Sequence, residues 1–179
     1  MAATGMRFFI AALSILFAAS LIGYLVVRGR SESWIPEGVQ AAPPGLWIST
    51  IIIVLSGITI QLALTGIRRG RALDLKLGLA ATFLLGLAFL VAQALNWLGL
   101  IRLALSPEVA AMYQFTFFFL TGLHGLHVLG GLIPLGMALS GALHGAYSAE
   151  NHAGVHHVAI YWHFLGVVWL VMFVVMFLV

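Results

Sequence analysis

The sequence predicts an all-α integral membrane protein in which five transmembrane helices form a single bundle. Of 179 residues, 63% are hydrophobic and only 7% are charged, whereas soluble domains carry roughly 25% charged residues. Five apolar runs reach the ~20 residues that a helix needs to cross a bilayer. Polar or basic segments separate these runs. We therefore expect one membrane domain over residues 1–179, with no room for a second.

The expected spans follow the five apolar runs in chain order, and each has a distinguishing feature. The first lies between Arg7 and Arg28 and is too long for a typical signal-peptide core, so we expect it to be retained. The second contains Gln61, whose carboxamide is costly in lipid and is expected to face protein. The fourth exceeds the bilayer thickness, so we expect it to tilt or extend and Pro134 to bend it. The expected bounds are about 8–27, 46–66, 77–100, 109–139 and 155–179.

The distribution of basic residues predicts the orientation of the bundle. Lys and Arg accumulate in cytoplasmic loops of membrane proteins. The N-terminus and the second and fourth loops hold five of them, whereas the first and third loops hold three. The two sets are Arg7, Arg68, Arg69, Arg71 and Lys76 against Arg28, Arg30 and Arg102. The prediction is an N-terminus inside and a C-terminus outside.

Composition excludes several classes of function. The chain has no cysteine, which rules out disulfides, thiolate metal sites and iron–sulfur clusters within it. All five acidic residues lie outside the expected spans, which argues against a stand-alone proton pump or ion-coupled transporter. The excess of positive charge comes from a few loop arginines and does not indicate a nucleic-acid surface.

Seven histidines are the residues that invite a metal or haem hypothesis. The first three spans contain none, so the ligand set that a haem or a copper–haem centre needs on several helices is incomplete. His124 and His127 are three residues apart and share one helix face. We expect them to form a structural polar cluster with Trp162, His163 and Gln93, because an unpaired polar group in an apolar interior costs several kcal/mol. We assign no catalytic, cofactor-binding or metal-binding residue to this chain.

The basic loop between the second and third spans carries Arg68, Arg69 and Arg71. Arginines beside a membrane attract anionic lipid head groups by about 1 kcal/mol each. They also serve as simple topology signals, and the sequence leaves both interpretations open.

Two motifs stand out in the last two spans. The first is TGLHGLHVLGGLI over Thr121–Ile133, preceded by an aromatic run. The second is YWHF over Tyr161–Phe164, followed by Trp169. With these motifs the chain resembles subunit III of the haem–copper oxidases, and Gln93 matches a glutamine of the family's third-from-last span. The resemblance covers essentially the whole chain and is closest to the short, five-helix form of the family.

The resemblance implies a non-catalytic accessory subunit of a respiratory terminal oxidase that reduces dioxygen to water. It implies that haem and copper reside in partner subunits, that the main contact is oxidase subunit I, and that phospholipid is bound. Its role would be to support proton uptake and stability during turnover, in a bacterial-type plasma membrane. The electron donor, cytochrome c or quinol, would bind to other subunits.

Four positions depart from the family pattern, because neutral or weakly basic residues replace the usual acidic ones. They are Ser14, Asn96, His156 and Gly166. The carboxylate roles proposed for the family in proton handling or lipid gating therefore do not carry over to these positions.

Two alternatives remain open at the level of sequence. The nearer one is an accessory subunit of the related nitric oxide reductases. The further one is an independent membrane electron carrier that binds haem through His124, His127 and His163.

Overall fold

The structure, a computed structural model, describes residues 2–31, 34, 44–102 and 107–178, with side chains at 4–31, 34, 44–102 and 112–178. The described residues form five α-helices, and each is long and apolar enough to cross a membrane. Their bounds are Ala2–Gly29 (α1), Pro44–Arg68 (α2), Ala72–Arg102 (α3), Pro107–Leu143 (α4) and Ala153–Phe177 (α5). The prediction of an all-α membrane bundle with five transmembrane helices is confirmed.

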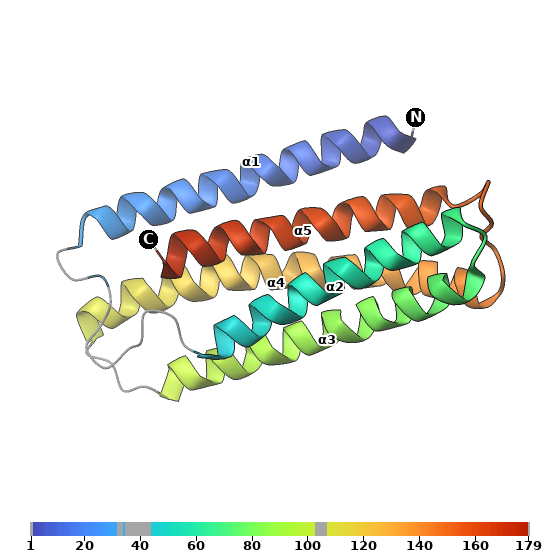
Figure 1. Cartoon of the computed structure of the whole chain (residues 1–179). Coiled ribbons are helices and arrows are strands. Elements are labelled where there is room, and N and C mark those ends of the chain that lie inside the picture. The colour runs from blue at the N-terminus through green and yellow to red at the C-terminus, as the bar shows by residue number, and fades with distance from the viewer. Residues whose placement is uncertain (1, 32–33, 35–43, 103–106, 179) are drawn as a thin grey trace.

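The five helices run roughly alongside one another, and α1 lies along the outside of the bundle formed by α2–α5 (Figure 1). The N-terminus, the α2–α3 turn and the α4–α5 loop lie at one end, and the C-terminus lies at the other. The segments expected on the cytoplasmic side therefore share one end of the bundle. Which side of a membrane that end faces stays a prediction.

Helix α4 is the longest element, with 37 residues and Pro134 inside it. At about 1.5 Å per residue it is about 55 Å long, well beyond a hydrocarbon core of about 30 Å. The helix continues past Pro134 to Leu143. The expectation that this element exceeds the bilayer thickness follows directly from its length.

Helices α2 and α3 form a tight antiparallel hairpin. The turn depends on Gly70, whose φ of 71° lies in the left-handed region that glycine adopts without strain. The N–H of Gly70 donates to the carbonyl of Ile67, and that of Arg71 donates to the carbonyl of Gly66. These two bonds are a Schellman motif, which satisfies the last carbonyls of α2 and returns the chain directly into α3.

Helix α5 occupies the centre of the bundle and has apolar residues on all sides. Trp162, Leu165 and Trp169 on this helix are at most 1% exposed. A helix that is hydrophobic all round is suited to burial among other helices.

The outlying helix α1 is fixed to the last turn of α5 by two polar side chains. The Tyr24 hydroxyl donates to the carbonyl of Met176 (3.3 Å), and Arg28 Nη1 donates to the carbonyl of Val175 (3.2 Å). The last carbonyls of a helix have no partner within it. A cation near this end of a helix also interacts favourably with the helix dipole. These contacts hold the C-terminal half of α1 against the bundle.

Candidate functional site

The two histidines of α4 lie on the inner side of the helix but in different environments. The His124 side chain is fully buried. Aromatic rings surround it: the ring centroids of Phe17, Phe89 and Trp169 lie 6.2, 5.6 and 5.3 Å from the imidazole centroid. Within the described residues neither ring nitrogen of His124 has a hydrogen-bond partner. His124 therefore packs as an aromatic ring between α1, α3 and α5.

His127 lies one turn further along α4 and is half-buried. Its Nδ1–H donates to the carbonyl of Leu123 (2.7 Å), which fixes the ring against its own helix. The imidazole meets the ring of Phe17 on α1 edge-on at 5.1 Å. The Tyr161 hydroxyl of α5 donates to the backbone carbonyl of His127 (3.0 Å). His127 thus stands where α1, α4 and α5 meet.

Two tryptophans of α5 donate hydrogen bonds to hydroxyl groups of α2. Trp162 Nε1 donates to Ser56 Oγ (2.9 Å), and Trp169 Nε1 donates to Thr50 Oγ1 (3.0 Å). Each hydroxyl in turn donates to a carbonyl of its own helix. These two indole–hydroxyl pairs set the rotation of α5 against α2, since both donors are satisfied only in this register.

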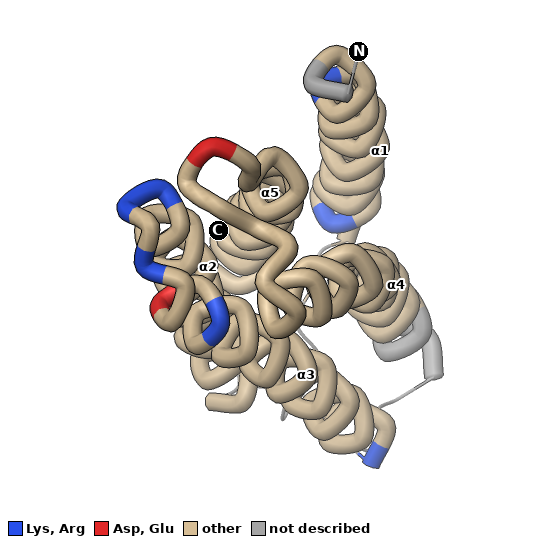
Figure 2. The backbone as a smooth tube through the Cα atoms, turned by 90° about the vertical axis from the view of Figure 1, so that its right-hand side faces the viewer, with Lys and Arg blue, Asp and Glu red and all other residues tan. Residues whose placement is uncertain are grey.

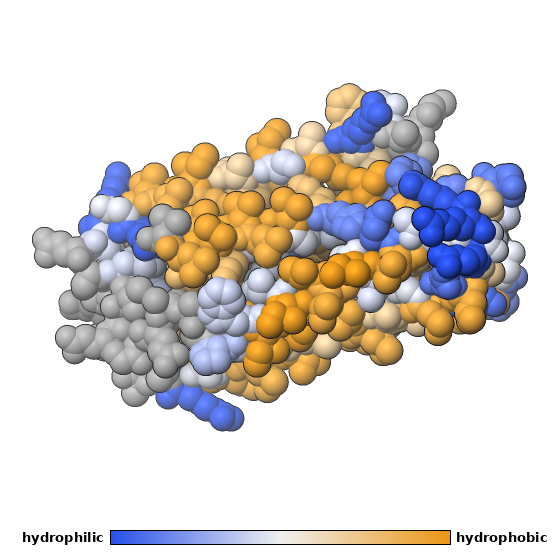
Figure 3. Space-filling view, in the orientation of Figure 1, coloured by the Kyte–Doolittle hydropathy of each residue, from blue (hydrophilic) through white to orange (hydrophobic). Residues whose placement is uncertain are grey.

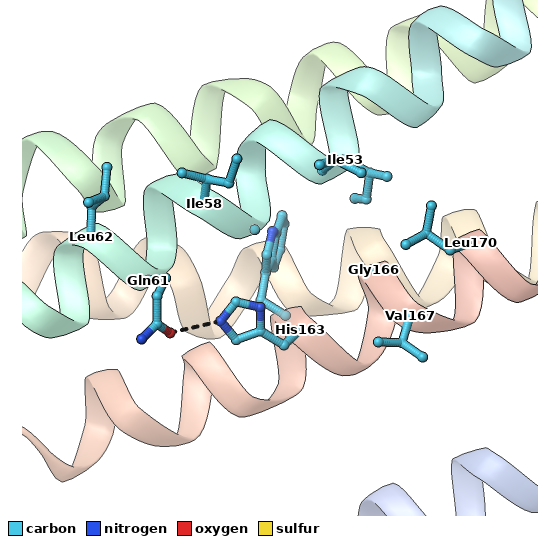
Figure 4. Close-up of a pocket in the computed structure, with 11 residues that line it drawn as sticks. Ile53, Ile58, Gln61, Leu62, His163, Gly166, Val167 and Leu170 are labelled. Carbon is cyan, nitrogen blue, oxygen red and sulfur yellow. Dashed lines mark hydrogen bonds between the residues drawn. The ribbon is translucent and has the colours of Figure 1, made fainter.

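His163 and Gln61 form a pair at the surface of the bundle. The Nε2–H of His163 donates to Gln61 Oε1 at 3.1 Å, across the groove between α2 and α5 (Figure 4). The side chain of Gln61 is exposed. Within the described residues only His163 contacts this carboxamide by a hydrogen bond. The expectation that Gln61 faces protein stays a prediction.

Gln93 of α3 is buried, with 3% of its surface exposed. Neither its amide oxygen nor its amide nitrogen has a hydrogen-bond partner among the described residues. It lies one turn from Trp97, whose Nε1 donates to Thr121 Oγ1 of α4 at 3.0 Å.

The structure divides the five residues of the expected polar cluster among several places. His124 and His127 line the inner face of α4, Trp162 faces Ser56, and His163 lies at the surface groove. In the part of the chain that the structure describes, no hydrogen bond joins two of the five. The partners that sequence reasoning missed are Thr50, Ser56 and Gln61, all on α2. Their hydroxyl and amide groups are visible in the sequence, but nothing in their spacing shows which one a tryptophan or histidine of α5 will meet.

The basic end of the bundle collects the loop arginines. In Figure 2, which looks onto this end, Lys and Arg gather at the α2–α3 turn, and an acidic residue lies in the loop before α5. Arg68 Nη2 lies 3.4 Å from His156 Nδ1, and Arg71 Nε forms an exposed ion pair with Asp74 (3.0 Å). In the α4–α5 loop, the Glu150 backbone N–H and the Ser148 hydroxyl lower the pKa of the Glu150 carboxyl below its usual value.

At the four positions where the family usually has an acidic residue, this chain has either a side chain with a nearby polar partner or a glycine that leaves space. Ser14 Oγ donates to the carbonyl of Ile10 within α1 (2.8 Å), and Asn96 Nδ2 donates to Ser49 Oγ on α2 (3.3 Å). His156 lies beside Arg68, and Gly166 lines the α2–α5 groove. Among the residues that the structure describes, no group of three or more His, Cys, Asp or Glu side chains is placed to hold a metal ion.

The comparisons with known proteins assign the family. A model of the family "Cytochrome c oxidase subunit III" matches residues 3–179. The chain belongs to the cytochrome c oxidase subunit III family. The resemblance in its two motifs is therefore confirmed over nearly the full length.

The relatives extend across bacteria and animals. The chain is 31% identical to "Cytochrome c oxidase subunit 3" of Thermostichus vulcanus, over 97% of this chain and 85% of the relative. It is 32% identical to the protein of the same name from Synechocystis sp., over 97% of this chain and 74% of the relative. It is 34% identical to that of Cyprinus carpio, over 79% of this chain and 53% of the relative. These members of the subunit III family favour an oxidase over the two alternatives, a nitric oxide reductase subunit and an independent haem carrier.

Proposed function

We propose that this chain is a non-catalytic accessory subunit of a respiratory haem–copper oxidase in a bacterial-type plasma membrane. It would associate in the bilayer with the other oxidase subunits, chiefly the catalytic subunit I, where the haem and copper reside. The single observation that carries the proposal is the family match over residues 3–179. The role would be to support proton uptake and to keep the complex stable during turnover.

The contacts made by the two motifs of α4 and α5 support a packing role. The histidines and tryptophans of α4 and α5 hydrogen-bond or stack across helix interfaces, as His127 does with Phe17 and Trp162 with Ser56. In membranes, such contacts and close van der Waals packing are what hold helices together. Side chains used in this way stabilise an assembly without taking part in its chemistry.

Bound phospholipid is the second part of the proposal. A groove of about 390 Å³ between α2 and α3 begins at Arg71 and Asp74 and continues past Leu62 and Leu77. An acyl chain fits the apolar part, while the arginines at the turn attract the phosphate by about 1 kcal/mol each. The head-group contacts would be Arg68, Arg69 and Arg71, all exposed at the basic end.

Purification of the intact complex from the native membrane tests the main proposal. We expect this chain to co-purify with a haem–copper subunit I, and oxygen consumption to continue in its absence but to decline during turnover. The proposal fails if the chain purifies without such a subunit, or if the isolated chain shows reduced-minus-oxidised Soret and α bands in stoichiometric amount.

The His127→Ala variant tests the structural role within the complex. It removes the ring that meets Phe17 of α1 but keeps the backbone carbonyl that accepts from Tyr161. We expect the chain to be lost from the complex sooner in detergent, while the initial rate of oxygen reduction stays near that of the native complex. An immediate loss of turnover in a fully assembled complex would contradict the structural role.

For the lipid, replacement of Arg68, Arg69 and Arg71 by Gln should lower the amount of anionic phospholipid retained per complex, measured by mass spectrometry. The control is Arg30→Gln, at the opposite end of the bundle, which should leave the lipid content unchanged.

A further inference from the structure

The groove between α2 and α5 is a mostly apolar surface feature that contains one polar pair, Gln61 and His163. It is lined by Ile53, Gly57 and Gln61 on α2 and by His163, Gly166 and Val167 on α5, and its volume is about 420 Å³. We refer to it as the α2–α5 groove. In Figure 3 the middle of the visible face is mostly hydrophobic, and a hydrophilic patch interrupts it. In Figure 4 Gln61 and His163 face one another across the groove.

The hydrogen bond between these two side chains does not use the Gln61 NH₂ group or the second ring nitrogen of His163. Because His163 Nε2–H donates to Gln61 Oε1, the ring nitrogen Nδ1 of His163 is an acceptor. The Gln61 NH₂ group keeps two donors. Within the described residues neither the Nδ1 atom nor the NH₂ group has a partner. The two small residues beside them leave access, since a Cβ on Gly57 would lie 3.8 Å from His163 Nδ1, and one on Gly166 would meet no atom within 4 Å.

The pair lies at a depth where lipid offers no hydrogen bonds. Gln61 is seven residues before Arg68, which at 1.5 Å per residue places it about 10 Å along the helix from the basic end. An unsatisfied polar group among acyl chains costs several kcal/mol. Other exposed hydroxyls of the spans avoid this cost, because Ser14 and Thr65 donate to carbonyls of their own helices. Within the described residues the Gln61 NH₂ group and His163 Nδ1 have no such hydrogen bond to their own helices.

We propose that the α2–α5 groove is a docking surface for a transmembrane helix of a partner subunit. That helix would bring a hydroxyl or carboxamide side chain, which accepts from Gln61 and donates to His163 Nδ1. Gly57 and Gly166 allow the close helix approach that polar membrane interfaces use. This inference rests on the proposed function, because it assumes an assembly with other subunits.

A lipid acyl chain is the competing occupant, and the outer face of α4 shows what a surface suited to it looks like. Its exposed residues Leu126, Leu129, Ile133 and Met137 are 52–70% exposed and entirely apolar. The α2–α5 groove differs from that face by its polar pair. We therefore assign the groove to protein and the α4 face to lipid.

Site-specific photo-crosslinking in the intact complex distinguishes the two occupants. A diazirine amino acid replaces Val167 in the groove or Ile133 on the α4 face, which are 59% and 67% exposed. Mass spectrometry should find a partner-subunit peptide attached at position 167 and lipid attached at position 133. Lipid adducts alone at position 167 would overturn the inference. A chain that does not co-purify with an oxidase at all would instead refute the proposed function.

A matched pair of glycine variants tests the same surface by occlusion. Gly166→Leu fills the groove, and Gly130→Leu adds the same bulk on α4, and neither added Cβ meets an atom of the chain within 4 Å. Both variants should accumulate in the membrane normally. We expect only Gly166→Leu to be lost from the complex during detergent purification, and its full retention would overturn the inference. Gln61→Leu removes the free donors and should raise the dissociation rate roughly three- to twenty-fold, the range that measured membrane hydrogen bonds span.

Discussion

Helices α2 and α3 approach one another closely at Gly78, and adding one methyl group there should measurably destabilise the bundle. A Cβ on Gly78 would lie 2.7 Å from Ala63 Cβ and 2.8 Å from the carbonyl oxygen of Thr59. Carbon atoms pack best at about 3.5–4.0 Å. Both neighbouring groups are rigid, because one is a methyl attached to the backbone and the other is the backbone itself. The helices would therefore have to separate by about 1 Å.

The expected cost follows from that displacement. Overpacking of this kind costs about 1–3 kcal/mol. The separation would also stretch the hydrogen bond between Thr59 Oγ1 and Thr82 Oγ1, now 2.8 Å, which crosses the same interface. Replacing glycine by alanine gains up to about 1 kcal/mol of helix propensity, and a control at another glycine of α3 cancels this gain.

Gly99→Ala is that control, since its Cβ meets no atom within 4 Å. The assay is the free energy of unfolding of the purified chain in detergent, measured by titration with a denaturing detergent. We expect Gly78→Ala to be about 1–3 kcal/mol less stable than Gly99→Ala. Equal stability of the two variants would refute the reasoning that rigid backbone contact fixes the α2–α3 distance.

Further predictions concern single contacts of α5 and α1. Trp162→Phe should lower the free energy of unfolding by about 0.6–1.7 kcal/mol, because it deletes the bond to Ser56 while keeping an aromatic ring. A double-mutant cycle with Ser56→Ala isolates that bond, and a coupling energy near zero would contradict its importance. Arg28→Ala should accelerate amide hydrogen exchange in the C-terminal half of α1, because the anchor to the end of α5 is lost. Arg30 is exposed and lies two residues after Arg28, so Arg30→Ala should leave the exchange unchanged. An identical response of both variants would count against the anchor.

The positions of the helices could be predicted from the sequence because the bilayer imposes their length. Each expected span lies within an observed helix, except at the C-terminus, where α5 ends at Phe177. The Schellman turn at Gly70 and the central position of α5 were not predicted. Hydropathy gives the length of each span and identifies the span as apolar. Because these helices are apolar on most sides, hydropathy does not give the rotation of one helix against another.

The polar contacts depend on that rotation, which explains why the expected cluster is distributed differently. Trp162 and His163 are adjacent in the chain, yet on a helix adjacent residues point about 100° apart. One therefore faces Ser56 in the interior, and the other faces Gln61 at the surface. A set of polar residues collected by type, without the pairing of α5 with α2, could not separate these two environments.

The exposed position of Gln61 has a different origin. The sequence predicts that a carboxamide in a span faces protein, since lipid offers no hydrogen bonds. It does not show whether that protein is the chain itself or a partner. In a subunit, a polar side chain left at the surface of the chain shows where the remaining cover has to come from another protein.

The same reasoning applies to the positions where acidic residues are replaced. Asn96 donates to Ser49 across the α2–α3 interface, and Ser14 donates within α1, so at both positions a neutral group is satisfied by the chain. Gly166 instead leaves space beside His163. Of these three positions, Asn96 thus carries a contact between helices, Gly166 leaves access for one, and Ser14 bonds only within its own helix. The polar groups that cross between helices act by holding the helices together, and their loss should appear first as loss of assembly.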